Sequence, residues 1–233
     1  MSRQSLARLS GTLYLLMGLP GAFALVYMPS TFLVHGEAAA TAARIAASPM
    51  LYRSGVFAEL ICGVFAIWLG MVLYELFKDV DRGQARLMVG FVFGMVAIGV
   101  VSTVALAAPI VFTSGSQSLS AFTVDQLNAL TLASWSLRSQ SIHVATMYWG
   151  LWLLPLGTLI NRSGFLPRWL GVLVLVAGWS YVINSITYFF LPAYSGIVNN
   201  VTILPQAAGE LGFTLWMLIK GVGDSEARYD GRY

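Results

Sequence analysis

Two carboxyl side chains fall inside long apolar stretches of this 233-residue chain, where charged groups are costly. Glu59 lies in the second such stretch. Glu210 lies about ten residues before Lys220, which is about 15 Å along a helix. An acid in an apolar setting can hold or donate a proton, or pair with a cation. These two residues are therefore the first candidates for acid–base or binding chemistry.

The spacing around each carboxyl group predicts that it faces the interior of a helix bundle. Small faces let helices approach closely, and Glu59 has small helical neighbours, namely Gly55, Cys62, Gly63, Ala66 and Gly70. Around Glu210, hydrogen-bonding side chains recur every four residues and form one stripe, which consists of Thr202, Gln206, Glu210 and Thr214. A lipid-facing helix would not carry four such groups on one face.

Five more polar side chains fall within or beside apolar stretches, namely Arg53, Arg138, His143, Tyr181 and Asn184. We predict that they line one polar cavity, open to the outer side, together with Gln206 and the two carboxyl groups. Simpler roles remain open. The histidine and asparagine can hydrogen-bond a neighbouring helix, the two arginines can anchor the chain at the interface, and each carboxyl group can be a neutral acid satisfied by a carbonyl or an arginine.

Several tryptophans fall deep inside the apolar stretches rather than at the membrane interfaces, where this residue normally concentrates. Trp149, Trp179 and Trp216 are of this kind. They can simply pack. Together they can also wall a pocket for a hydrophobic ligand, or stabilise a cationic centre through cation–π contacts.

Other kinds of site are not indicated. The chain has no GxSxG, HExxH, CxxC or Walker-type motif, and two histidines with one cysteine give no diagnostic metal spacing. We therefore predict no metal and no cofactor. The net charge of +3 is small and scattered, so nucleic acid is not an expected partner. Membrane lipids and a hydrophobic small molecule are the expected partners. The oligomeric state is left open.

The elements that must position these residues are transmembrane helices. Hydrophobic residues make up 58% of the chain and charged residues 10%, against about 25% charged in a soluble domain. A helix needs about 20 apolar residues to cross the hydrocarbon core. Six stretches qualify, so we predict an all-α, polytopic bundle of six transmembrane helices at 9–28, 55–77, 87–112, 141–160, 169–190 and 202–219.

The distribution of lysine and arginine predicts the orientation of these helices. Of the 13 basic residues, three fall in the connections on one side, namely Arg44, Arg53 and Arg138, and the other ten on the opposite side. Basic residues collect on the cytoplasmic side, so both termini are predicted to be cytoplasmic. We expect one transmembrane domain over residues 1–221 and a short polar cytoplasmic tail over 222–233.

Two connections on the outer side are longer than a turn requires. The alanine-rich segment Glu37 to Ala47 predicts a short surface helix, and a helix beginning near Thr123 is predicted to run into the fourth span. In the third span, Gly90 and Gly94 form a GxxxG pattern, which is typical of close helix packing.

The chain resembles a bacterial membrane family catalogued as domain of unknown function 4386. The resemblance rests mainly on Tyr148–Gly157, which reads YWGLWLLPLG, and on Asn161–Gly171, which reads NRSGFLPRWLG. Further matches are Tyr52-Arg53 with Glu59, and Glu210 with Leu215-Trp216. The resemblance implies a multi-pass protein of the bacterial plasma (inner) membrane, and it implies no activity.

Three functions fit these residues. The first is binding of an amphiphilic small molecule or lipid between the deep aromatic residues and the polar stripe. The second is an enzyme that uses Glu59 and Glu210 as catalytic acid and base on a lipid-soluble, isoprenoid-like substrate. The third is a proton-coupled transporter with Glu210 as the carrier.

Overall fold

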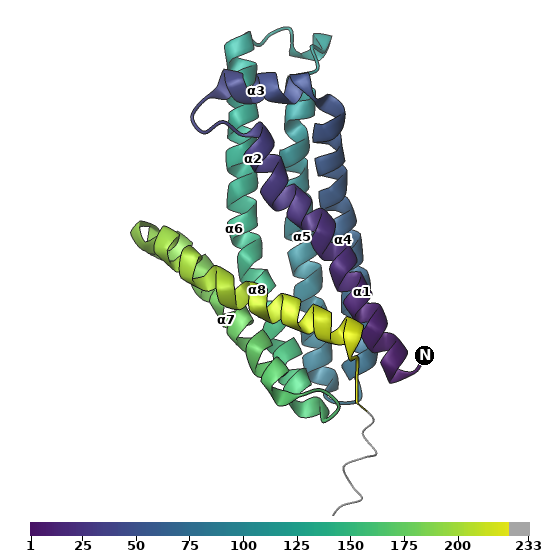
Figure 1. The fold of residues 1–233 in the computed structure, drawn as a ribbon. Coiled ribbons are helices and arrows are strands. Elements are labelled where there is room, and N and C mark those ends of the chain that lie inside the picture. The colour runs from purple at the N-terminus through teal and green to yellow at the C-terminus, as the bar shows by residue number, and fades with distance from the viewer. Residues whose placement is uncertain (224–233) are drawn as a thin grey trace, which may run out of the picture. The chain divides into compact units, whose positions relative to one another are not determined.

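The computed structural model describes residues 1–223, and within them every regular element is helical (Figure 1). The predicted tail from residue 224 on lies outside the described residues. The α-helices are α1 (Arg3–Ala22), α2 (Met28–Phe32), α3 (Ala38–Ala47), α4 (Pro49–Phe77), α5 (Arg82–Phe112), α6 (Val124–Ser163), α7 (Arg168–Phe190) and α8 (Ser195–Ile219). A π-helix, Phe23–Tyr27, joins α1 to α2, and short 3₁₀ turns occur at Gln117–Leu119 and Pro192–Tyr194.

Four helical segments of the described chain are long and apolar enough to cross a membrane, namely Arg3–Phe32, Pro49–Phe77, Arg82–Phe112 and Arg168–Phe190. The prediction of an all-helical, membrane-embedded protein is therefore confirmed. The predicted fourth and sixth spans lie within α6 and α8. These two helices are long enough, but they do not reach the apolar standard of the other four.

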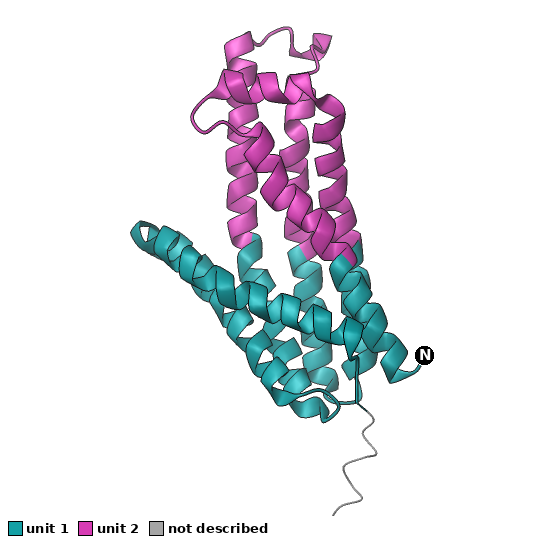
Figure 2. Cartoon of the chain, in the orientation of Figure 1, with its two compact units in different colours: residues 1–15, 65–95, 145–233 teal, residues 16–64, 96–144 magenta. Residues whose placement is uncertain are grey.

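The chain divides into two compact units (Figure 2). Unit 1 contains Met1–Leu15, Phe65–Met95 and the chain from Ala145 on, and unit 2 contains Leu16–Val64 and Val96–Val144. The boundaries fall inside α1, α4, α5 and α6.

Glycines let the helices of unit 1 approach closely. A Cβ atom on Gly150 of α6 would lie 2.5 Å from the Gly178 carbonyl oxygen of α7. Seven residues further along α6, a Cβ on Gly157 would lie 2.9 Å from the carbonyl oxygen of Gly171. Helix α8 packs along α7 (Figure 1), with Gly209 as its small residue at the contact. Backbone-to-backbone contact of this kind replaces the hydrophobic driving force that helices lack in lipid.

Unit 2 is built around aromatic residues and an irregular first helix. Its buried cluster consists of Met28, Phe32, Ile45, Tyr52, Leu106 and Trp135. Pro29 has no N–H to donate to the preceding turn and crowds the carbonyl group four residues earlier. The helix before it widens into the π-helix Phe23–Tyr27, in which the Met28 N–H donates to the Phe23 carbonyl oxygen.

Side-chain caps fix where α5 and α6 begin. In unit 2, the Gln126 N–H donates to the Thr123 hydroxyl (3.3 Å) and the Thr123 N–H donates to the Gln126 side-chain oxygen (2.9 Å), which forms a capping box before α6. In unit 1, the Gln84 N–H donates to the Asp81 carboxylate (3.0 Å) at the start of α5. The predicted helix starts near Glu37 and Thr123 are both observed, as α3 and α6.

Candidate functional site

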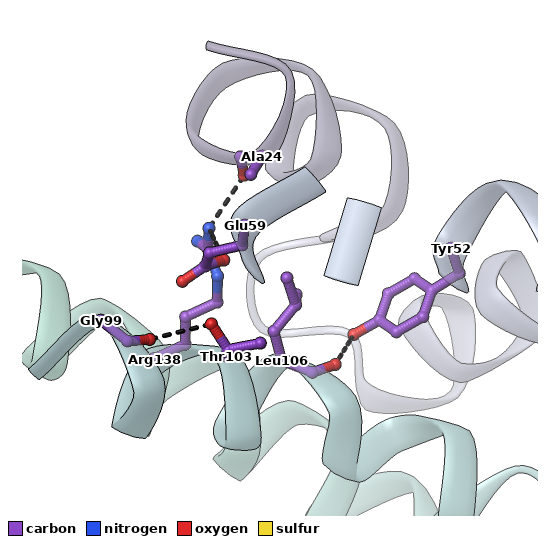
Figure 3. A network of polar contacts seen from close by, with 7 residues as sticks. All are labelled: Ala24, Tyr52, Glu59, Gly99, Thr103, Leu106 and Arg138. Carbon is purple, nitrogen blue, oxygen red and sulfur yellow. Dashed lines mark hydrogen bonds and ion pairs between the residues drawn. The ribbon is translucent and has the colours of Figure 1, made fainter. Parts of the chain in front are cut away.

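The first polar centre, called here the Arg138 centre, joins three helical segments of unit 2 (Figure 3). The Arg138 guanidinium of α6 pairs with the Glu59 carboxylate of α4 at 3.0 Å. The same Nη2 atom donates to the Ala24 carbonyl oxygen at 2.8 Å. Only 3% of the Arg138 side chain is exposed. A buried arginine is therefore matched by one carboxylate and one backbone carbonyl.

The π-helix supplies that carbonyl. In an α-helix the Ala24 carbonyl oxygen would accept from the N–H of residue 28. Here the Met28 N–H donates to Phe23 instead, so the Ala24 oxygen is released for Arg138. Single π-helical turns are often found at functional sites.

Aromatic rings frame the Arg138 centre. The guanidinium lies 5.6 Å from the centroid of the Trp135 ring, close enough for a cation–π contact. Trp135 meets Tyr52 edge to face, and the Tyr52 hydroxyl donates to the Leu106 carbonyl oxygen at 2.8 Å (Figure 3). Within the described residues, the buried Nε of Arg138 has no hydrogen-bond partner.

The second polar centre, called here the Glu210 centre, lies in unit 1. The Tyr14 hydroxyl of α1 donates to one oxygen of the Glu210 carboxyl group at 3.2 Å, and the Tyr181 hydroxyl of α7 donates to the other at 3.1 Å. Glu210 itself belongs to α8. No ion pair among residues 1–223 includes it. The carboxyl group is thus held by two neutral donors from two other helices.

A shell of aromatic rings surrounds these hydroxyl groups. Tyr14 packs against Trp152 and Phe213, with ring centroids 5.8 and 6.0 Å away. Tyr181 meets Trp149 edge to face at 6.0 Å. Tyr14, Trp152 and Phe213 are buried, whereas Glu210, Tyr181 and Trp149 are half-buried. The hydroxyl groups thus lie among buried rings, while Glu210, Tyr181 and Trp149 keep part of their surface exposed.

The polar stripe of α8 faces the interior of unit 1. Thr202, Gln206 and Thr214 are buried, and Glu210 is half-buried. The buried Nε2 of Gln206, one turn from Glu210, has no hydrogen-bond partner in the described part of the chain. It is a donor placed beside the carboxyl centre and left unused.

The other predicted site residues lie elsewhere. Asn184 of α7 donates to the Asn199 side-chain oxygen of α8 at 3.0 Å, so it links two helices. Trp216 packs against Trp169 and donates to the Gly221 carbonyl oxygen. Trp179 is 55% exposed. His143 is half-buried on the unit 2 part of α6.

The two carboxyl groups belong to different units, and each has its own partners: Glu59 in unit 2 and Glu210 in unit 1. Among residues 1–223, no group of three or more His, Cys, Asp or Glu side chains that could hold a metal was found. Sequence reasoning missed Tyr14, although Ser10 and Tyr14 mark a buried polar face of the first helix at helical spacing. It also missed the Ala24 carbonyl group, for which no residue type gives a signal.

Comparisons with known proteins place the chain in a family. An uncharacterized protein of the archaeon Archaeoglobus fulgidus is 33% identical over 75 residues, which are 32% of this chain and 43% of that protein. The chain thus matches less than half the length of this relative. No solved structure matches the chain. The model of a family described as a domain of unknown function matches residues 9–221, and that range includes both polar centres. The chain therefore belongs to the family described as domain of unknown function DUF4386.

Proposed function

We propose that this chain binds an amphiphilic small molecule within the membrane, with the polar end of the ligand at the Glu210 centre. The observation that carries the proposal is a carboxyl group held by two tyrosine hydroxyl groups inside an aromatic shell, with no cation from the described chain beside it. An ionised group in this setting is costly unless it is neutralised. A ligand that carries a positive charge neutralises it.

The chemistry of the centre favours an organic cation over a metal ion. Carboxylate oxygen and aromatic faces together attract alkylammonium groups, because the ring faces are electron-rich. Tyr181 donates to Glu210, Trp149 packs on Tyr181, and both rings are half-buried. The unused Nε2 donor of Gln206 offers a hydrogen bond to an acceptor atom of the same ligand. The apolar part of the ligand lies along the exposed apolar residues of α7 and α8.

The experiment titrates hexyltrimethylammonium into the full-length protein in an uncharged detergent and measures binding by calorimetry. We expect saturable binding that weakens about tenfold or more in Glu210→Gln, which corresponds to about 1.4 kcal/mol. The matched control is Glu75→Gln, since Glu75 is an exposed glutamate paired with Lys78 at 2.6 Å. It should bind like the wild type. Equal binding of the uncharged analogue, in which carbon replaces the ammonium nitrogen, would show that Glu210 does not recognise charge.

Proton-coupled transport is a second candidate, because one observation favours it. The Tyr14 and Tyr181 hydroxyl groups flank the Glu210 carboxyl group on both oxygens and give it hydrogen-bonded neighbours from α1 and α7. A proton carrier needs such neighbours. In proteoliposomes, transport requires a pH-dependent flux that Glu210→Gln abolishes. Binding without flux leaves the first proposal standing alone.

The acid–base enzyme reading is less well supported. It needs Glu59 as one of two reacting groups, and Glu59 is paired with Arg138. The carboxylate is held in that ion pair rather than left free for a substrate. The reading stays a prediction, and turnover of an isoprenoid-like substrate that is lost in Glu59→Gln would establish it.

We also propose six spans, with α6 and α8 crossing the membrane, both termini in the cytoplasm, and location in the plasma membrane. The 25 residues of α8 extend about 37 Å, which exceeds the hydrocarbon thickness. After the exposed Asn199 and Asn200 in its first turns, the polar residues of α8 are buried or half-buried, and its exposed residues are apolar, among them Ile203, Leu204, Leu211, Leu215 and Ile219. The polar stripe lowers the overall hydropathy of α8 without facing lipid. The ten-to-three distribution of basic residues supports the orientation.

A further inference from the structure

An open groove of about 340 Å³ lies on the surface of unit 2 between α4 and α5. Its lining consists of Arg53, Val56, Phe57, Leu60 and Ile110. None of these residues belongs to the Glu210 centre. The groove is therefore a feature independent of the proposed function.

The α4 side of the groove is one continuous helical face. Residues 53, 56, 57 and 60 have the spacing i, i+3, i+4 and i+7, so they lie above one another. Phe57 is 63% exposed and Leu60 is 46% exposed, on a helix that is apolar enough to cross a membrane. These side chains face the acyl chains of the bilayer.

The floor of the groove is anchored. Val56 and Ile110 pack against the buried cluster of unit 2 that contains Tyr52, Leu106 and Trp135. A groove supported by a packed aromatic core keeps its shape. It offers about 10 Å of apolar surface along α4 from Arg53 to Leu60, which suits part of one acyl chain.

A positive charge closes one end of this apolar strip. Arg53 is exposed, and no ion pair among residues 1–223 includes it. It lies in the second turn of α4, near the helix N-terminus, where the helix dipole adds positive potential. A cation at the end of an apolar groove complements a molecule with a negative head and an apolar tail.

We propose that this groove binds one phospholipid with an anionic headgroup. Its phosphate pairs with the Arg53 guanidinium, and one acyl chain lies over Val56, Phe57, Leu60 and Ile110. The planar guanidinium forms two parallel hydrogen bonds to phosphate oxygens. The source of the phosphate is a membrane lipid, since the apolar strip has no counterpart in a free phosphate.

Native mass spectrometry of the full chain tests the proposal, with phosphatidylglycerol compared against phosphatidylcholine of the same acyl chains. We expect one phosphatidylglycerol to bind preferentially. Arg53→Gln should weaken its binding about fivefold and leave phosphatidylcholine nearly unchanged. Phe57→Ser should weaken both lipids, because it removes acyl contact and keeps the charge.

The control for charge alone is Arg44→Gln. Arg44 is an exposed arginine of α3 in the same unit, it donates to the Thr31 carbonyl oxygen, and it does not line the groove. It should not change the preference. The proposal is overturned if Arg44→Gln and Arg53→Gln have equal effects, if neither lipid binds one to one, or if glycerol 3-phosphate alone competes as well as the lipid. The Glu210→Gln variant should keep the lipid preference, which separates this result from that of the Glu210 centre.

Discussion

At the residue scale, each polar centre contains a carboxyl group inside an apolar helix, and the two carboxyl groups have different kinds of partner. Arg138 and Glu59 neutralise each other, and the Ala24 carbonyl takes up a further guanidinium donor. Glu210 instead accepts hydrogen bonds from two neutral hydroxyl groups, and no cation of the described chain pairs with it. From this difference we infer a structural role for the first centre and propose the second as a binding site.

The structural role of Arg138 predicts a large loss of stability when it is truncated. Arg138→Ala leaves the half-buried Glu59, 13% of whose side chain is exposed, without its partner. Breaking one side of a buried pair costs about 3–5 kcal/mol. The double variant Arg138→Met with Glu59→Leu should recover most of that loss, because no charge is left unpaired. Unfolding in detergent, followed by circular dichroism, measures both. A double variant as unstable as Arg138→Ala would mean that packing, not charge, carries the effect.

The hydroxyl groups around Glu210 give a second prediction. Tyr181→Phe keeps the ring that packs on Trp149 but removes one donor to the carboxyl group. We expect the free energy of unfolding to fall by about 1–3 kcal/mol. Tyr27→Phe is the control, since Tyr27 is 44% exposed, and its loss should be near zero. An equal loss in the two variants would show that the hydrogen bond from Tyr181 to Glu210 does not stabilise the fold.

The residues of the two polar centres were only partly predictable from the sequence. A carboxyl group inside an apolar stretch is conspicuous, so Glu59 and Glu210 stand out at once. Their partners are not, because a tyrosine or a backbone carbonyl reveals nothing about which remote segment it contacts. The arginine partner of Glu59 was among the predicted residues, but the pairing itself comes from the packing of α4 against α6.

At the element scale, the C-terminal ends of the second and third spans were predictable from hydropathy and their N-terminal starts were not. The predicted second and third spans end at Phe77 and Phe112, as α4 and α5 do. The helices begin five to six residues earlier than the predicted spans, because the residues before each span include polar side chains, Arg53 and Ser54 in α4 and Arg82, Gln84 and Arg86 in α5. The π-helix had no signal in hydropathy, because it depends on Pro29 and on the carbonyl that Arg138 binds.

Glycine spacing gives a prediction for the packing of α6 on α7. Gly150→Ala places a methyl group against the Gly178 backbone, so we expect a loss of about 1–3 kcal/mol from overpacking. Gly90→Ala in α5 is the matched control, because nothing lies within 4 Å of the added atom. It should be neutral or stabilise by up to about 1 kcal/mol. Thermal unfolding in detergent compares them, and equal losses would show that close approach is not the cause.

Of the two glycines in the GxxxG pattern of α5, Gly94 lies at a close helix contact and Gly90 does not. A Cβ on Gly94 would lie 2.6 Å from the Tyr148 ring, whereas Gly90 faces open space in the described chain. The more telling glycines lie in α6 and α7, seven residues apart in each helix. Gly150, Gly157 and Gly171 fall within the segments on which the family resemblance rests, so those segments include residues of close helix packing.

The cap of α5 predicts a pH-dependent stability. The Gln84 backbone N–H, helped by the nearby Arg162 guanidinium, holds the pKa of Asp81 below its ordinary value. Such a group stabilises the fold fully above its unfolded-state pKa of about 3.9 and loses that contribution as pH falls through the lower folded-state pKa. The Tm difference between wild type and Asp81→Ala should therefore be constant near neutral pH and shrink below about pH 4. In the same loop, Asp79→Ala should lower Tm less at neutral pH, and a Tm difference for Asp81→Ala that grows with acidity would contradict the assignment.

At the scale of the whole molecule, the number of spans decides where the Glu210 centre lies. Four helical segments of the described chain are long and apolar enough to cross the membrane. Whether α6 and α8 also cross it decides between four and six spans. The Glu210 centre draws Glu210 from α8 and Tyr181 from α7. A binding site within the membrane thus requires α8 to cross it.

Two connections distinguish six spans from four. With six, Ala193 between α7 and α8 faces outward and Ser163 at the end of α6 faces the cytoplasm. With four, in which α6 and α8 do not cross, the two exchange sides.

Cys62 is the only cysteine, so Cys62→Ala gives a background in which one new cysteine reports its own position. In intact cells a membrane-impermeant maleimide should label Ala193→Cys and should label Ser163→Cys only after permeabilisation. Ser118→Cys and Asp79→Cys serve as outer and inner references in both topologies, and the reverse labelling of Ala193 and Ser163 would remove α8 from the membrane and the Glu210 centre with it.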